Sequence, residues 1–167
     1  MPRNNLFDQA LDIEKKGESL YRRFSLEASD EGMKFIFTWL ADQERKHYDI
    51  FEKMKAGEFA LVAESAIVLN IQNIFSGWKD IADRIDVKVA QADLYRQALE
   101  IENRSVLIYE DYASSRVTPE QKDLCLAIVK EEKRHRWILE NIIEFVTKPE
   151  VWAENAEFDH LEEDYYL

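Results

Sequence analysis

Glu44-Arg45-Lys46-His47 and Glu132-Lys133-Arg134-His135 share the pattern Glu-x-x-His and lie 88 residues apart in this chain. The same offset relates further residues of identical type: Glu14 to Glu102, Tyr21 to Tyr109, and Ile50 to Ile138. Repetition at a fixed offset is the signature of a duplicated architecture, and the repeated positions are those that both copies keep. The sequence therefore predicts two equivalent halves, each with one Glu followed by one Glu-x-x-His pair.

Apolar residues around both pairs recur at alternating spacings of three and four, which is the period of one helix face. The first inward stripe consists of Phe37, Leu40, Glu44, His47, Phe51 and Met54. The second consists of Cys125, Ile128, Glu132, His135, Leu139 and Ile142. Similar stripes pass through Glu14 and Glu102, so each of four predicted helices turns one carboxylate inward.

Start and stop signals predict where these helices lie. The first should span about residues 4–28, and Ser29-Asp30 supplies a break and an N-cap for a second that runs to about Lys55. The third should begin near Asp86. Thr118-Pro119-Glu120-Gln121 is a typical helix start, and Lys148-Pro149 should end that fourth helix near Thr147.

The long apolar segment between the second and third helices predicts a crossover that contains a short helix. The expected fold is an all-α bundle of two antiparallel hairpins joined by this crossover. We expect the bundle to occupy residues 1–148 and an acidic, aromatic tail to occupy residues 149–167. The apolar part of the crossover, from Leu61 to Trp78, could supply a subunit interface, and we expect a homodimer.

Composition excludes several classes of protein. Only 4 Gly and 3 Pro occur in 167 residues, too few for the many turns of an all-β domain. The net charge of −12 disfavours nucleic acid and anionic membrane surfaces as partners. Cys125 is the single cysteine, and neither a membrane-spanning apolar run nor a signal peptide is evident, so we expect a cytoplasmic protein.

The four inward carboxylates require compensation, because moving an ion out of water costs roughly several kcal/mol. A total stability of about 5–15 kcal/mol cannot absorb that cost four times. Protonation or metal must neutralise them, and a His one helical turn from a Glu favours metal, since both side chains can reach one ion. A single Glu-x-x-His is more commonly a solvated surface pair, but two copies on apolar stripes predict a site for two divalent ions. The predicted ligands are Glu14, Glu44, His47, Glu102, Glu132 and His135. Iron, manganese and zinc all accept such ligands.

Residues near these ligands allow two interpretations each. Tyr21 and Tyr109 could donate hydrogen bonds to ligating carboxylates on facing helices, or they could be ordinary core aromatics. Gly17 and Ser105 could leave room at the metal site or merely allow close helix packing. Glu18 would replace Glu14 as a ligand if the helix phase were different.

The chain resembles the rubrerythrin-like branch of the ferritin-like di-iron superfamily over about residues 8–146. The resemblance rests on Ala10-Leu11-x-x-Glu14 leading to Tyr21, Leu40-Ala41-x-x-Glu44-x-x-His47, Ala98-Leu99-x-x-Glu102 leading to Tyr109, and Glu132-x-x-His135. One Glu from each of two helices and a Glu-x-x-His from each of two others is the known pattern of di-iron carboxylate bundles. The resemblance implies two irons held by the six residues named above, and a diferrous centre that reduces hydrogen peroxide or dioxygen.

Two departures from rubrerythrin qualify this expectation. Rubrerythrin carries a rubredoxin-like domain with four cysteines, whereas Cys125 stands alone, so we expect electrons from an external electron-donor protein. Rubrerythrin also has an additional carboxylate in its third helix, where this chain has Ser105 one turn beyond Glu102. The leading hypothesis is a di-iron oxidoreductase. The alternatives are ferrous-iron oxidation with iron handling or storage, and a metal-stabilised interaction module that binds a partner through its tail.

Overall fold

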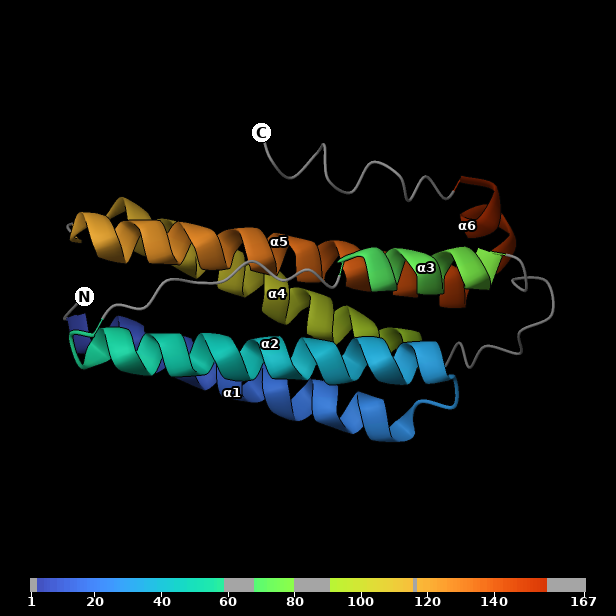
Figure 1. Cartoon of the computed structure of the whole chain (residues 1–167), viewed down its shortest axis with the longest axis horizontal. Helices are drawn as coiled ribbons and strands as arrows, with labels where there is room; N and C mark the ends of the chain where they lie inside the picture. Colours follow the sequence, from blue (N-terminus) through green and yellow to red (C-terminus); the bar gives the residue numbers. More distant parts are fainter. Residues whose placement is uncertain (1–2, 59–67, 80–90, 116, 156–167) are drawn as a thin grey trace. The chain divides into compact units, whose positions relative to one another are not determined.

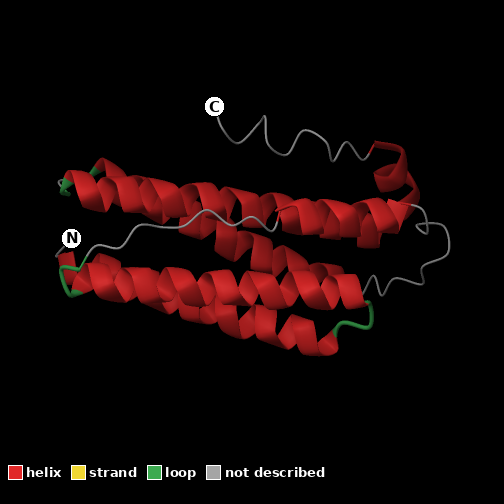
Figure 2. Cartoon of the chain, in the orientation of Figure 1, coloured by secondary structure: helices red, strands yellow, loops and turns green. Residues whose placement is uncertain are grey.

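The computed structural model describes residues 3–58, 68–79, 91–115 and 117–155. Almost all of these residues are helical, and no strand occurs among them (Figure 2). The helices are α1 (Arg3–Glu27), α2 (Glu31–Lys55), α3 (Val68–Lys79), α4 (Ala92–Ser114), α5 (Pro119–Thr147) and α6 (Pro149–Asn155), as Figure 1 shows. The predicted all-α class is therefore confirmed.

The predicted helix boundaries agree with the structure wherever it describes them. α2 ends at Lys55, and α5 runs from Pro119 to Thr147, as expected. The short helix expected in the crossover is α3. The start predicted for the third long helix near Asp86 lies outside the described residues, and the described helix α4 begins at Ala92.

Side-chain caps explain why α2 and α5 begin where they do. The Asp30 carboxylate accepts a hydrogen bond of 2.9 Å from the Met33 amide, which satisfies one of the first amides of α2. At α5 the Thr118 hydroxyl accepts from the Gln121 amide at 3.3 Å, while the Gln121 side chain accepts from the Thr118 amide at 3.0 Å. This reciprocal capping box is the one that the sequence predicts.

The chain divides into two compact units, which are described separately. The first comprises residues 1–63 and 101–133 and contains α1, α2, the second part of α4 and the first part of α5. The second comprises residues 64–100 and 134–167 and contains α3, α6 and the remaining parts of α4 and α5.

The core of the first unit is built from the inward stripes of its helices. Phe7 of α1 meets Tyr112 of α4 edge-on with ring centroids 5.4 Å apart, and Phe51 of α2 meets Tyr109 of α4 at 4.7 Å. Cys125 lies in the same cluster, and burial raises the pKa of its thiol to about 12. The apolar members of the predicted stripe on α2 are all buried: Phe37, Leu40, Phe51 and Met54.

Aromatic packing of α3 against α5 and α6 dominates the second unit. The ring centroids of Phe75 in α3 and Trp152 in α6 lie 6.1 Å apart. Trp78 stacks on Phe145 of α5 with ring centroids 4.7 Å apart. The Trp152 indole donates to the Asn141 side chain at 3.2 Å. The described apolar residues of the crossover are thus used within the chain, so the expectation that they form a subunit interface is not supported for Phe75 and Trp78.

Within the described part of the chain, no helix combines the length and apolar character that crossing a membrane requires.

Candidate metal centre

Each of four helices places a predicted glutamate ligand in the interior. Glu14 on α1, Glu44 on α2, Glu102 on α4 and Glu132 on α5 expose between 0% and 1% of their surface. They sit on the same helix stripes as the apolar core residues, so the packing that buries those residues also brings the glutamates inside. The predicted inward orientation of all four side chains is confirmed.

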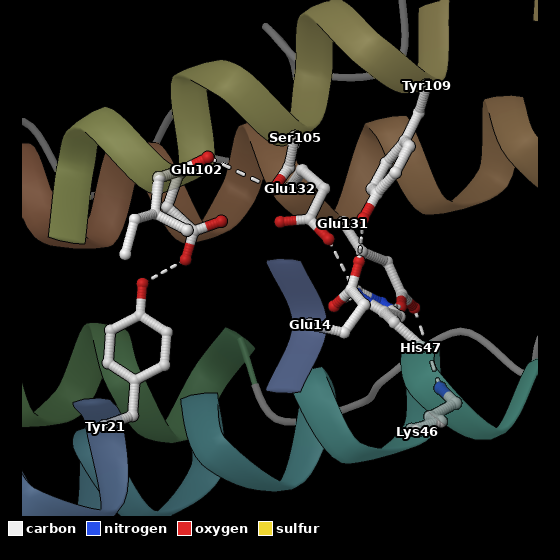
Figure 3. A network of polar contacts seen from close by, with 10 residues as sticks. Glu14, Tyr21, Lys46, His47, Glu102, Ser105, Tyr109, Glu131 and Glu132 are labelled. Atoms are coloured by element: carbon white, nitrogen blue, oxygen red, sulfur yellow. Dashed lines mark hydrogen bonds and ion pairs between the residues drawn. The ribbon is translucent and has the colours of Figure 1, made fainter. Parts of the chain in front are cut away.

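One group of candidate ligands lies wholly within the first unit. Glu14, Glu44, His47 and Glu132 each offer an atom, and these atoms all lie within 4.8 Å of one another. The His47 Nδ1 atom is 2.8 Å from Glu132 Oε1 and 3.5 Å from Glu14 Oε2. Figure 3 shows these three side chains converging from three helices.

Glu102 belongs to a second group of candidate ligands that shares Glu44 and Glu132 with the first. Its carboxylate, with those of Glu44 and Glu132, offers oxygens that also lie within 4.8 Å of one another. His135 follows Glu132 by one turn of the continuous helix α5 and is fully buried. Its place on α5 mirrors that of His47 after Glu44 on α2, as the repeat predicts.

The two tyrosines are engaged with carboxylates from the opposite repeat. The Tyr21 hydroxyl donates to Glu102 Oε1, and the Tyr109 hydroxyl donates to Glu14 Oε1 (Figure 3). Burial first, and then the nearby carboxylate charges, raise the pKa of each phenol well above its ordinary value. Both tyrosines therefore stay protonated donors, and the interpretation of them as ordinary core aromatics is wrong.

Glu131 is a member of the cluster that sequence reasoning missed. Its Oε2 atom lies 2.7 Å from His47 Nε2, and its Oε1 atom lies 3.7 Å from the Lys46 ammonium. A signal was present, since Glu131 stands three residues after Ile128 and four before His135, which is again the spacing of an inward stripe. The Glu-x-x-His pattern includes Glu132 but not Glu131, so only Glu132 was predicted as a member of the site.

Protons are held tightly in this cluster. Burial, followed by repulsion from Glu132, raises the pKa of Glu14. For His47, burial by itself lowers the pKa, but the charge of Glu132 and hydrogen bonds to Glu131, Glu132 and Glu14 outweigh it, and the pKa rises well above its usual value. Each bound proton neutralises part of the negative charge of the buried carboxylates. A divalent ion would neutralise more of this charge.

Gly17 makes room for a ligand-type side chain. A Cβ atom at this position would collide with the Glu44 carboxylate oxygen and lie 3.1 Å from the Glu44 carboxyl carbon. The Glu44 side chain therefore occupies the space that a larger residue at position 17 would need. This supports the interpretation that Gly17 leaves room at the metal site. Ser105, its counterpart in the repeat, donates to the Ile101 carbonyl of its own helix at 3.1 Å.

Glu18 does not replace Glu14. Glu18 lies near the surface, 3.4 Å from the Arg22 guanidinium, whereas Glu14 is fully buried. The helix phase inferred from the sequence is therefore correct for α1.

The cluster suits a metal centre. Its donors are oxygens and imidazole nitrogens, all buried, and an uncompensated charge on the carboxylates is costly so far from water. Carboxylate and imidazole sets of this kind hold iron, manganese or zinc, and two imidazoles with four carboxylates match two divalent ions.

Comparison with known proteins agrees with this geometry. A family model described as Rubrerythrin matches residues 5–143, a range that includes the four glutamates and two histidines predicted as ligands. Curated proteins and solved structures give no significant match. The family match covers most of the chain and confirms the ferritin-like bundle that the resemblance implies. The chain belongs to the rubrerythrin family of ferritin-like di-iron carboxylate proteins.

Proposed function

We propose that this protein is a di-iron oxidoreductase that reduces hydrogen peroxide, or dioxygen, with electrons from an external donor protein. The observation that carries the proposal is the buried carboxylate–imidazole cluster, which lies within the residues matched by the family. Glu14, Glu44, Glu102 and Glu132, together with His47 and His135, are the residues that would hold the two ions.

Two bound ferrous ions would supply the two electrons that convert one hydrogen peroxide and two protons into two water molecules. The protein's own contribution is to hold the ligands and exclude water. Tyr21 and Tyr109 donate hydrogen bonds to Glu102 and Glu14, which orients these carboxylates before metal binds. Phe51, against the Tyr109 ring, is part of the apolar wall that shields the site.

Stopped-flow oxidation of anaerobically iron-loaded protein tests this proposal, with hydrogen peroxide and dioxygen compared at equal concentration. We expect faster oxidation by peroxide and complete re-reduction by an added donor. Glu14→Gln should lose the fast phase, whereas Glu18→Gln, one turn along the same helix and partly exposed, should keep it.

Other outcomes would favour one of the two alternative functions, iron handling or a metal-stabilised interaction module. Faster oxidation by dioxygen, followed by uptake of iron beyond about two ions per chain, would indicate iron handling, and light scattering would then show a large assembly. Iron binding without oxidation by either reagent would indicate a metal-stabilised interaction module.

A further inference from the structure

Glu131 is buried within the site but does not belong to the proposed ligand set. It exposes only 6% of its surface, and its two oxygens have different partners. Oε2 meets His47 Nε2 at 2.7 Å, while Oε1 faces the Lys46 ammonium at 3.7 Å (Figure 3). One carboxylate of α5 thus contacts two consecutive residues of α2.

This contact determines which nitrogen of His47 faces the ligand cluster. A ligating histidine binds the ion through one ring nitrogen and donates the other ring N–H to a hydrogen-bond acceptor, which fixes the tautomer and the ring orientation. Nε2 faces the Glu131 acceptor, and Nδ1 lies 2.8 Å from Glu132 Oε1 and 3.5 Å from Glu14 Oε2. Nδ1 is therefore the atom directed at the proposed metal position.

The internal repeat breaks at this residue. The offset of 88 relates every proposed ligand to a residue of the same type, but it relates Glu131 to Gln43. Gln43 is also buried, yet its amide carries no charge. A charge-assisted hydrogen bond is roughly twice as strong as a neutral one, and a carboxylate behind the ring makes the imidazole a better ligand. The two halves therefore offer the same ligand types, but the residue that matches Glu131 in the repeat carries no charge.

We infer that Glu131 is a positioning residue that holds His47 with Nδ1 toward the metal and makes the His47 position the tighter of two metal sites. This inference rests on the metal centre of the proposed function. It adds that the two ions are inequivalent and that the His47 position fills first.

A zinc titration of the full chain tests the inference without any turnover. Zn²⁺ is added against a chromophoric chelator, and proton–nitrogen correlation spectra of ¹⁵N-histidine-labelled protein follow both rings. We expect two binding steps separated by about tenfold or more, within the range that an outer hydrogen-bond partner contributes. At one equivalent, His47 Nδ1 should show the metal shift while Nε2 keeps its proton.

Glu131→Gln retains a hydrogen-bond acceptor and removes only the charge. It should weaken the first step about tenfold, so that the two steps merge. Glu144→Gln, on the exposed surface of the same helix, should leave both steps unchanged. Thermal melting of each metal-free variant shows whether it folds.

The remaining results would overturn the inference. Two steps of equal affinity in the natural protein, or zinc reaching His135 first, would overturn it and leave the metal centre standing. Unchanged steps in a folded Glu131→Gln variant would also overturn it. Absence of zinc binding in the natural protein would overturn the inference and the proposed function together.

Discussion

The two tyrosine–carboxylate pairs connect the halves of the repeat at the level of single residues. Tyr21 of α1 donates to Glu102 of α4, and Tyr109 of α4 donates to Glu14 of α1, so each half orients a carboxylate of the other. From the sequence, these phenols could either have carboxylate partners or be ordinary core aromatics. The sequence could not identify the partners, because that requires knowing which helices face one another.

Replacing either tyrosine by phenylalanine removes one of these hydrogen bonds. We expect Tyr21→Phe and Tyr109→Phe each to lower metal affinity about 10–100-fold, because the ligating carboxylate loses its fixed orientation. Zinc competition titration measures the effect. Tyr95→Phe is the matched control, since the Tyr95 hydroxyl donates to Gln91 at 2.9 Å. Equal affinities in all three variants would show that the phenols do not support the site.

Gly17→Ala tests the space that Glu44 occupies. Alanine usually stabilises a helix interior relative to glycine, but here the added methyl group meets a buried carboxylate. We expect a loss of about 1–3 kcal/mol in the free energy of unfolding, together with weaker metal binding. Gly77→Ala in α3 is the control, because its Cβ would meet nothing within 4 Å. A more stable Gly17→Ala protein with normal metal binding would contradict the assignment.

At the scale of whole helices, apolar periodicity and capping residues were enough to predict where the long helices lie and which face of each is buried. The stripes of α2 and α5 and the capping box at Thr118 are predictable because each depends on neighbours in sequence. Glu131 was missed because it lies on the same inward face as Glu132 but outside the repeated motif. For α3 the sequence predicts only that a short helix lies within the apolar crossover, without its bounds.

The cap at the start of α2 should be worth a measurable part of its stability. Asp30→Ala leaves the Met33 amide without its side-chain acceptor, and we expect a loss of about 1 kcal/mol in the free energy of unfolding. Urea denaturation measures this loss. Ser29→Ala, at the exposed neighbouring position, should change the unfolding free energy by less than about half as much. A comparable loss in both variants would show that the cap is not specific to Asp30.

For the molecule as a whole, protons and metal should compete for the same buried groups. The raised pKa values of Glu14 and His47 mean that both hold protons more tightly in the folded, metal-free chain than in the unfolded chain. Their stabilising contribution is present below the unfolded values of 4.5 and 6.5 and is lost as the pH rises through the folded values. The metal-free protein should therefore lose this contribution toward alkaline pH, and a bound ion should restore it.

Thermal melting with Zn²⁺ and with a chelator checks this competition. We expect the Tm difference between the two samples to be larger at about pH 8 than at about pH 6, because metal binding releases protons. At 100 times the dissociation constant, an ion stabilises the folded state by about 2.7 kcal/mol. A Tm difference that is the same at both pH values would contradict the proposed competition.

If the buried cluster binds two metal ions, anaerobic titration with Fe²⁺ should show this stoichiometry. We predict two ions per chain in the natural protein, loss of this stoichiometric loading in Glu132→Ala, and two ions in Glu140→Ala, whose side chain is exposed on the same helix. Full occupancy in Glu132→Ala, or no tightly bound iron in the natural protein, would show that the buried cluster is not a site for two metal ions.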